Sequence, residues 1–468
     1  MLLLCIFIPG VAQNVSDGWN KNRTARLTKP VFVYNNWSAY DELSDNIPLD
    51  EALAMKELDH IVRLKKLGVQ VDYYMMDAFW FDVNEGYRKW RPDCWPEGPK
   101  RWLDACKREG IKPGLWFSTN LLRIGGEANT MRIIPEWESS VAEDGTTLCL
   151  FRGGYLHHLM QTLQMYADMG IKMFKFDFAY FDAATPDAKC TMLPTDIEEQ
   201  NKNAFISAIK EFRYRNPDVL FIGYNGFGGD MENTVTPFRK TVDLRWLEIF
   251  DTMYCGDPRL SDVPMMNFWR SQDLYSDHMT FQYLFNGVPV RRIDNCAFMI
   301  GTTGTCYNRA LNAWKGMMVL TMARGGWLNV CHGNIDLLSD DDARWMAKVQ
   351  QLYMKVQQYG SISAFGAIPG KALPYGYMAS AEGGNLYTVV NASQEKAKVM
   401  LPEATGTGRV LFTDSGFMPV LEKNIVELGP EQMVVVGYGK FSNREYDLGI
   451  EKAVSYTHLR AHETGRNL

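Results

Sequence analysis

The sequence GIKMFKFDF at residues 170–178 follows a helix-like run and has the pattern of a short buried strand. Successive side chains of a strand point to opposite faces, so Lys175 and Asp177 share one face and three phenylalanines share the other. The apolar face suits packing against helices, whereas a lysine and an aspartate are costly to bury unless they are paired or used. In a parallel barrel their face points inward, and the carboxyl end of the strand borders the active site. The stretch therefore predicts a barrel strand whose Lys175 and Asp177 serve the active site. The alternative is that these two residues form a structural ion pair at the end of the strand.

The same unit occurs three times between residues 48 and 178: an amphipathic helix, a glycine, a β-branched residue and a strand. The glycines that end these helices are Gly68, Gly110 and Gly170, and a glycine at this place takes the left-handed conformation that stops a helix. Helices that alternate with short buried strands imply a parallel sheet. Eight strands are predicted, at residues 31–35, 70–76, 112–118, 172–178, 218–224, 265–271, 296–301 and 327–332. Eight such units predict an α/β fold, a (β/α)8 TIM barrel, and a doubly wound sheet ranks second.

The pattern divides the chain into four segments. Residues 28–357 carry the barrel pattern, and residues 358–450 carry short alternating strands that predict a small C-terminal antiparallel β-sandwich. Residues 1–27 are an N-terminal remnant or connector, and residues 451–468 form a non-native-looking tail that breaks from the preceding composition. The apolar start is either the last strand of a missing upstream domain, which we favour, or a clipped signal peptide over residues 1–13. Only the second alternative predicts a periplasmic or secreted protein, so the compartment stays open.

The 468 residues carry a formal net charge of −6 and 22% charged side chains, an ordinary globular composition. This mild acidity gives no reason to expect nucleic acid or an anionic membrane as a partner. The nine cysteines are dispersed without a CxxC pair, which argues against a disulfide framework and a structural zinc site. His157 and His158 are adjacent and point apart on a helix, so we do not expect a metal pair. The apolar start is shorter than a membrane span, and no transmembrane segment is predicted.

Side chains at the carboxyl ends of barrel strands converge on one pocket, whatever their distance in sequence. The predicted strand ends carry three carboxylates, two cations and several aromatic residues. Such a set suits a glycosidase, in which two carboxylates act as acid and nucleophile, others bind hydroxyls, and aromatic faces stack on the sugar. The candidates are Trp37, Asp77, Trp80, Trp116, Lys175, Asp177, Tyr224, Asn225, Arg270 and Asp273.

These candidates also have structural interpretations, because an aspartate can cap a loop, a tryptophan can belong to the core, and an arginine can pair with a carboxylate. The alternative role is a loop cap for Asp77, a core position for Trp80 and Trp116, and an ion pair with a carboxylate for Arg270. Asp277 is an alternative to Asp273, although its setting resembles a helix start, where aspartate often caps. Among the remaining polar residues, His332 is taken as structural, and Glu248 and Asp251 stay open as further carboxylates.

At these residues the sequence resembles a known family. The motif KFD at residues 175–177, the segment GLWF at 114–117, the pair Asn36-Trp37 and the segment WRSQD at 269–273 are similar to the melibiases of clan D. The similarity is greatest to glycoside hydrolase family 36, with family 27 more distant. It extends over about residues 17–440, so it includes both the predicted barrel and the predicted sandwich.

The resemblance implies roles for individual residues. In the family a K-x-D motif ends the fourth strand, and its Asp is the covalent nucleophile; this role maps onto Asp177, with Lys175 as a substrate-binding residue. The family's acid/base follows a W-x-S-D or W-R-x-x-G-D pattern at the end of the sixth strand. Asp273 is the best match, with Arg270 as the sugar-binding arginine. The family's D-D-G-W-F motif keeps only Asp77 of its two aspartates here.

The implied function is that of a retaining exo-glycoside hydrolase that releases terminal α-linked galactose by double displacement, without a metal or organic cofactor. The carboxyl groups of Asp177 and Asp273 should then lie about 5–6 Å apart. The loop YNGFGG at residues 224–229 replaces the family's C-S-G-G-G, which leaves the exact sugar open. The alternatives are α-N-acetylgalactosaminidase, β-L-arabinopyranosidase, a raffinose-synthase-like transglycosidase, or an inactive glycan-binding protein. The expected partner is a carbohydrate substrate, and a homo-oligomer stays open.

Overall fold

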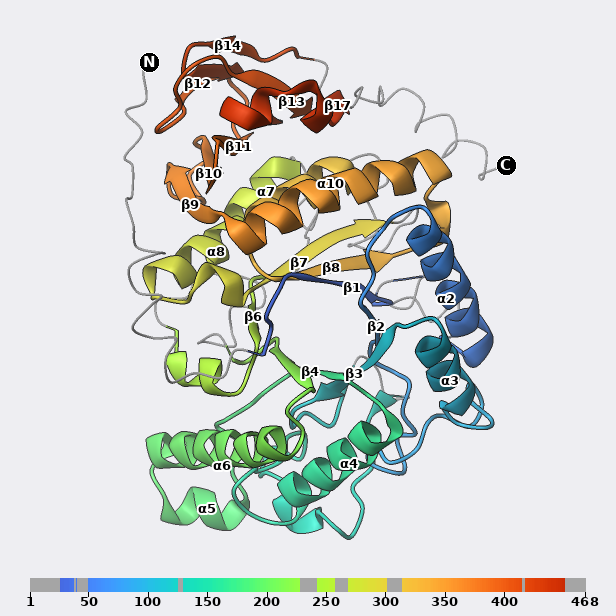
Figure 1. The fold of residues 1–468 in the computed structure, drawn as a ribbon. Helices are drawn as coiled ribbons and strands as arrows, with labels where there is room; N and C mark the ends of the chain where they lie inside the picture. The colour runs from blue at the N-terminus through green and yellow to red at the C-terminus, as the bar shows by residue number, and fades with distance from the viewer. Residues whose placement is uncertain are drawn as a thin grey trace, which may run out of the picture.

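Eight parallel strands close into a barrel in the order β1 to β8, as the ribbon in Figure 1 shows. The structure is a computed structural model that describes residues 26–37, 39, 49–124, 129–227, 242–256, 268–300, 314–414 and 417–450. The barrel strands are β1 (Val31–Asn35), β2 (Tyr73–Met76), β3 (Lys112–Ser118), β4 (Met173–Asp177), β5 (Leu220–Gly223), β6 (Thr252–Tyr254), β7 (Ile293–Ile300) and β8 (Leu328–Gly333). The predicted TIM barrel is confirmed.

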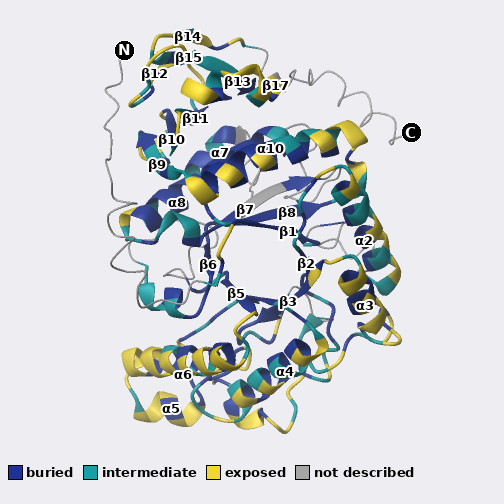
Figure 2. Cartoon of the chain, viewed as in Figure 1, coloured by how far each residue is buried: buried dark blue, intermediate teal, exposed yellow. Residues whose placement is uncertain are grey.

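Helices surround this barrel. They are α2 (Glu51–Lys66), α3 (Lys100–Arg108), α4 (Tyr155–Met169), α5 (Pro186–Thr191), α6 (Pro194–Arg215), α7 (Phe268–Leu274), α8 (Ser276–Phe285), α9 (Trp314–Ala323) and α10 (Asp340–Tyr359). Gly170 follows α4 with a φ of 108°, the left-handed conformation expected of a glycine that stops a helix. In Figure 2 the barrel strands are mostly buried, α4 and α6 each carry both buried and exposed residues, and α5 is mostly exposed.

The β4 strand, Met173–Asp177, has the two faces that its sequence predicts, but Phe178, expected on the apolar face, lies beyond the strand with its ring centroid 6.1 Å from that of Trp116. Phe174 and Phe176 point outward to α6, where their ring centroids lie 6.0 Å from that of Phe212 and 5.4 Å from that of Phe205. Because side chains alternate along a strand, Lys175 and the residue two positions later point into the barrel. The aromatic contacts therefore anchor the strand to its helix and fix the direction of the polar side chains.

The sixth strand lies at a different place from the predicted one. A strand was expected at residues 265–271, but residues 268–274 form helix α7, and β6 is the short strand Thr252–Tyr254. Three residues are too few to display the alternation that identifies a strand in a sequence. Residues 257–267, which include the start of the expected strand, lie outside the described part of the chain.

Two sheets follow α10 and form the predicted C-terminal sandwich. One has six strands in the order β17-β13-β16-β11-β10-β9, and the other has three in the order β12-β15-β14. Their bounds are β9 (Ser361–Gly366), β10 (Tyr375–Ala381), β11 (Gly384–Asn391), β12 (Ala397–Met400), β13 (Arg409–Thr413), β14 (Val420–Glu422), β15 (Ile425–Leu428), β16 (Gln432–Gly437) and β17 (Gly449–Ile450). All pairs in these sheets are antiparallel except β13 with β17.

The six-stranded sheet is buried on both faces. Tyr387 and Val389 lie in an apolar cluster with Val426 of the smaller sheet. Residues that alternate with them, such as Val390 and Tyr377, belong to the large cluster that continues into the barrel. The barrel and the sandwich therefore share one apolar core.

Candidate active site

The carboxylate of Asp177 lies at the carboxyl end of β4 and is held by donors from both neighbouring strands. Its Oδ1 accepts hydrogen bonds from the Asn225 side chain at 2.8 Å, from the Asn225 backbone N–H at 3.2 Å and from the Phe178 N–H at 2.9 Å. Its Oδ2 accepts one from the indole N–H of Trp116 on β3 at 3.3 Å. These donors fix the orientation of the carboxylate and favour its ionised form.

Burial opposes that ionisation. It raises the pKa of Asp177 above its ordinary value, while the Lys175 ammonium and the donors of Asn225 and Trp116 act to lower it. The Asp77 carboxylate raises it slightly further. The site therefore combines a dry environment with groups that stabilise a negative charge, which is the arrangement expected for a carboxylate nucleophile.

Lys175 points to the same interior space and forms a buried ion pair. Its Nζ donates to Oδ2 of Asp77 at 2.7 Å, and both side chains are nearly inaccessible to solvent. Oδ1 of Asp77 accepts from the Ala78 N–H at 2.9 Å, and the Asp77 N–H donates to the Asn36 side chain at 2.8 Å. Asp77 thus caps the loop after β2 through Oδ1 and binds Lys175 through Oδ2. The loop-cap interpretation accounts for the first contact but not for the second.

Two aromatic rings enclose the lysine. The Nζ of Lys175 lies 4.2 Å from the ring centroid of Tyr224 and 5.8 Å from that of Trp37. The Tyr224 ring stacks on Tyr254 of β6 with centroids 4.5 Å apart, and the Trp37 ring packs edge-on against His332 of β8 at 5.6 Å. A cation within about 6 Å of a ring is attracted to its face. The structure thus brings Trp37 and Tyr224 to Lys175.

Trp80 occupies a different place from the other candidates. Its indole N–H donates to the backbone carbonyl of Trp116 at 3.0 Å, so it lies behind that residue. Its ring packs in the core, with centroids 4.7 Å from Trp90 and 5.3 Å from Tyr166. The core interpretation therefore fits Trp80, whereas Trp116 contacts Asp177 directly.

The backbone after Asp177 is tightly constrained. Phe178 has a φ of 48°, a conformation that non-glycine residues seldom adopt. The next residue, Ala179, donates its N–H to the carbonyl of Asn225 at 3.1 Å. Gly226 has a φ of 99°, and a Cβ on it would lie 2.3 Å from the Ala179 carbonyl oxygen. The loops after β4 and β5 are thus locked together, and this contact places Asn225 beside Asp177.

Asp273 and Arg270 lie on α7, which Figure 1 shows between the barrel and the C-terminal strands. Asp273 is fully buried and accepts hydrogen bonds from the N–H groups of Gly370 at 2.7 Å and Ala372 at 2.9 Å, and Arg270 pairs with it. The expectation that Asp273 faces Asp177 depended on a strand at residues 265–271. That strand is a helix, so the basis for the expectation is removed, and the structural interpretation of Arg270 fits its contact.

The other carboxylates considered also have structural partners. Glu248 forms an ion pair with Lys210. Asp251 precedes β6, at the opposite end of the barrel from Asp177, and forms a buried ion pair with Arg213 at 2.8 Å. Asp277 is buried within α8 and contacts the C-terminal sheets. None of the three follows a barrel strand at its carboxyl end.

One residue near the site was missed from the sequence. Asp294 is fully buried on β7, and burial raises its pKa to about 7, while the Tyr224 hydroxyl and the Lys175 ammonium act to lower it. The available signal was an acidic residue inside an apolar strand, the same signal that identified Asp177. It was overlooked because the seventh strand was expected to begin at residue 296, and β7 begins at Ile293.

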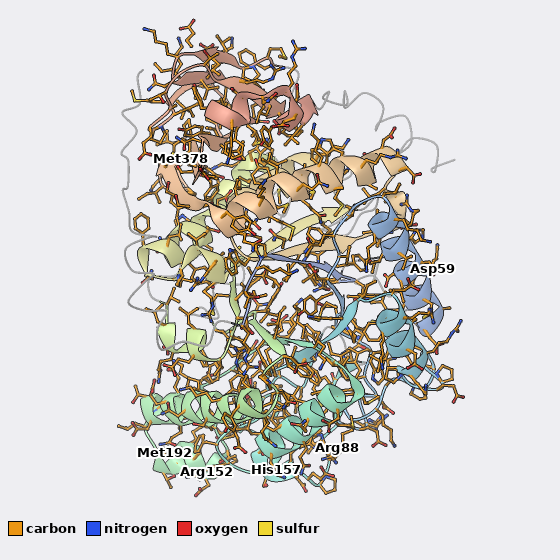
Figure 3. The ribbon with its side chains drawn as sticks, viewed as in Figure 1. Asp59, Arg88, Arg152, His157, Met192 and Met378 are labelled. Atoms are coloured by element: carbon orange, nitrogen blue, oxygen red, sulfur yellow. The ribbon has the colours of Figure 1, made fainter. Side chains whose placement is uncertain are left out.

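The described residues contain no group of three or more His, Cys, Asp or Glu side chains arranged to hold a metal ion. His157 lies on the outer edge of α4, where Figure 3 labels it, and its ring contacts Gln161. His158 is buried and contacts Glu136 and the Gly86 carbonyl instead. In the described segments no helix is both long and apolar enough to cross a membrane.

Comparison with known proteins relates this chain to α-galactosidases. No family model matches it. It is 26% identical over 220 residues to the α-galactosidase Mel36A of Lactobacillus acidophilus, an overlap of 43% of this chain and 28% of the relative. The chain resembles family 36, as its motifs predicted.

Solved structures share its fold at low identity. The galactosidase domain of the α-galactosidase-sucrose kinase AgaSK matches with a TM-score of 0.61 and 15% identity, over 88% of this chain and 55% of that one. The α-galactosidase of Lactobacillus brevis matches with a TM-score of 0.61 and 12% identity, over 88% and 56%. A variant of the family 36 α-galactosidase AgaA of Geobacillus stearothermophilus, in complex with raffinose, gives 0.58 and 13%, also over 88% and 56%. The chain spans about half the length of these structures.

Proposed function

We propose that this chain forms the catalytic barrel of a retaining exo-glycoside hydrolase that releases terminal α-linked galactose, with Asp177 as its nucleophile. The observation that carries the proposal is the setting of this carboxylate. It lies at the carboxyl end of β4, held by Trp116 and Asn225, beside the buried pair of Lys175 and Asp77. The similarity to α-galactosidases supports galactose as the sugar.

The hydrogen bonds of Asp177 favour one oxygen for attack. Among the described residues, Oδ1 accepts three hydrogen bonds, whereas Oδ2 accepts one long hydrogen bond, from Trp116. Hydrogen bonds withdraw electron density from the acceptor, so Oδ2 keeps more of its nucleophilic character. In the proposed first step Oδ2 attacks the anomeric carbon and the glycosidic oxygen leaves, which forms a covalent glycosyl-enzyme. The acid/base carboxyl gives its proton to the departing oxygen in this step, and in the second step it takes a proton from the water that releases the sugar.

The side chains around Lys175 are suited to hold the sugar. An ammonium and a carboxylate at 2.7 Å can donate to and accept from adjacent hydroxyl groups. The rings of Tyr224 and Trp37 offer apolar faces beside them, and such faces pack against the C–H groups of a sugar. We therefore assign substrate binding to Lys175, Asp77, Tyr224 and Trp37, and orientation of the nucleophile to Asn225 and Trp116.

We propose Asp257 in place of Asp273 as the acid/base. In barrel enzymes catalytic residues follow the carboxyl ends of strands, and Asp257 is the first carboxyl residue after β6 in the sequence. The run Tyr254-Cys255-Gly256-Asp257 has the order aromatic, any residue, small residue, aspartate, like the W-x-S-D pattern of the family. Asp257 itself lies outside the described residues, so its support is this position in the chain.

A panel of p-nitrophenyl glycosides tests the function. We expect release of p-nitrophenol from the α-galactoside. Release only from the α-N-acetylgalactosaminide or the β-L-arabinopyranoside would move the specificity to that sugar. Transfer of galactose to an added oligosaccharide in place of water would indicate a transglycosidase, and galactose binding without release would indicate a glycan-binding protein.

Matched variants test the roles of the carboxylates. Asp177→Asn should lower kcat by roughly a thousandfold or more, because the nucleophile is lost. Asp257→Asn should retain the first step on p-nitrophenyl α-galactoside, whose leaving group needs little protonation, and azide should restore turnover because it attacks without a base. Asp273→Asn serves as the control and should keep kcat. A loss in Asp273→Asn with azide rescue, and none in Asp257→Asn, would return the acid/base role to Asp273.

A further inference from the structure

Asp294 points into the barrel interior. Its neighbour Asn295 donates to the side chain of Asn329 on β8 at 3.0 Å. Asn329 in turn donates to the side chain of Gln357 on α10 at 3.1 Å, so this pair lies on the helix side of the barrel wall. Because side chains alternate along a strand, Asp294 faces the opposite way.

The register places Asp294 beside the sugar-binding side chains. It pairs with Tyr254 across β6 and β7, and the ring of Tyr254 stacks on Tyr224. Tyr224 is also the ring that lies 4.2 Å from the Nζ of Lys175. Asp77 therefore reaches Lys175 from β2, and Asp294 lies on the side of β7.

Among the described residues the buried Asp294 carboxyl has fewer partners than usually accompany a buried acid, since only the Tyr224 hydroxyl acts on it together with Lys175. Neither of its oxygens has a hydrogen-bond partner at bonding distance among the described residues. Asp277, another fully buried aspartate, accepts hydrogen bonds from Arg324, Tyr375 and Tyr377. A buried polar group without partners lowers stability. Asp294 is thus unlike an acid that holds a fold together.

Charge in this part of the barrel is unbalanced when every acid is ionised. Among the residues that the structure describes, the inward carboxyls of Asp77, Asp177 and Asp294 accompany one ammonium, that of Lys175. His332 adds no positive charge, because burial and the nearby Lys175 hold its pKa well below the ordinary value. Burial raises the pKa of Asp294 to about 7. Of the described titratable groups nearby, Cys255, whose thiol donates to the backbone carbonyl of Asp294, stays neutral in this range because burial raises its pKa to about 11.

We propose that Asp294 is a positioning residue that acts on sugar binding through Lys175. While Asp294 is neutral, the ammonium is directed to Asp77 and to the sugar hydroxyls. When Asp294 ionises, it attracts the ammonium toward β7, and the sugar is held less well. Binding should therefore weaken between pH 6 and pH 8. This inference rests on the proposed function, because it requires a sugar at Lys175.

Galactose binding by the wild-type chain and by Asp294→Asn, measured by calorimetry from pH 5 to pH 9, tests the proposal. We expect the Kd of the wild type to rise about fivefold or more across pH 6–8 and that of Asp294→Asn to stay nearly constant. The thermal midpoint gives a second readout. Asparagine removes the acid but keeps its shape, so Asp294→Asn should unfold at a higher temperature than the wild type at pH 8, whereas a structural aspartate would give a lower midpoint.

Two further variants make the result decisive. Asp277→Asn changes another buried aspartate and should lower the thermal midpoint without flattening the pH dependence of binding. Asp294→Ser serves as a second variant if the asparagine protein folds poorly, and it should show the same flat profile. An unchanged pH profile in both Asp294 variants overturns this inference alone, whereas failure of the wild type to bind galactose at any pH overturns the proposed function and this inference with it.

Discussion

Buried carboxyls in this molecule differ in what surrounds them, and their partners indicate their roles. Asp177 has donors on both oxygens, which suits a group that must carry a charge and react. Asp273 is held by backbone N–H groups from the C-terminal region, which suits a structural link. Both were chosen from sequence motifs of similar strength. The contacts of each side chain, which no motif encodes, separate them.

Glu57 offers a pH prediction at the scale of one residue. It is fully buried on α2, receives a hydrogen bond from Tyr34 at 3.2 Å and contacts the Tyr74 hydroxyl, and burial raises its pKa to about 8. A folded-state pKa above the unfolded value means that the folded state binds the proton more tightly. The stabilisation is therefore complete below the unfolded pKa and is lost as the pH rises through the folded one.

We expect the free energy of unfolding to fall by up to about 1.4 kcal/mol per pH unit from this group between pH 5 and pH 8. Glu57→Gln keeps the shape and the hydrogen-bonding capacity but does not titrate, so it should reduce that slope. Urea unfolding at four pH values measures both proteins. Equal slopes for the two would show that Glu57 is ionised in the folded protein at low pH.

The loops after β4 and β5 form the element on which the nucleophile depends. A side chain at Gly226 would collide with the Ala179 carbonyl and would require a left-handed backbone. Gly226→Ala should therefore displace Asn225 from Asp177 and lower kcat about tenfold or more, by analogy with other small misplacements of catalytic groups. It should also lower stability by more than the roughly 1 kcal/mol that a positive φ alone costs.

Gly110→Ala is the matched control for this substitution. Gly110 has a φ of 66°, but a Cβ there would have no neighbouring atom within 4 Å. It should show only the smaller stability loss, with kcat unchanged. Steady-state kinetics and thermal unfolding of the two variants separate backbone strain from the collision. Equal kinetics in both would mean that the contact of the two loops does not position the nucleophile.

Helices α7 and α8 act as the link between barrel and sandwich. Asp277 on α8 pairs with the fully buried Arg324 at 2.8 Å, and the hydroxyls of Tyr375 and Tyr377 on β10 donate to it at 2.7 Å. Removing one partner of a buried pair leaves the other charge without compensation. Asp277→Ala should therefore lower the free energy of unfolding by about 3–5 kcal/mol.

An exposed pair provides the comparison for this prediction. Asp340 pairs with Arg63 at 2.8 Å, and its side chain is 58% exposed. Surface pairs contribute little, so Asp340→Ala should change the free energy of unfolding by about 1 kcal/mol or less. Urea unfolding of both variants gives the comparison. If the Asp277 variant were as stable as the Asp340 variant, α8 would not be a major link to the sandwich.

At the scale of the molecule, the fold could be predicted further than the site. Strong periodicity and helix-ending glycines identified the helix before and the strand after each of Gly68, Gly110 and Gly170, because these signals are local. The sixth strand was predicted at the wrong place because β6 has only three residues, too few to show a pattern. The segment chosen instead has Arg270 and Asp273 three residues apart, a spacing that also places two residues on one face of a helix. Identifying Asp294 as a site residue required the register between β6 and β7, and a local sequence pattern does not contain that information.

The shared core predicts that barrel and sandwich depend on one another. A chain ended at residue 360 would leave Asp277 without its two tyrosine donors and would expose the apolar faces that Tyr375 and Val390 cover. We expect this truncated chain to be insoluble or to lack a cooperative unfolding transition. The test is to express the full chain and the truncated chain, and to compare their solubility and their thermal unfolding curves. A soluble truncated chain with an unfolding transition like that of the full chain would show that the barrel folds alone.

Covalent trapping of the intermediate tests the central claim most directly. The chain is incubated with a 2-deoxy-2-fluoro α-galactosyl donor that carries a good leaving group, a reagent that slows release of the sugar, and the labelled peptide is identified by mass spectrometry. We predict one fluorogalactosyl group per chain, attached to Asp177, and none in Asp177→Asn. Attachment to another residue, or turnover of α-galactosides without any covalent adduct, would contradict the assignment of Asp177 as the nucleophile.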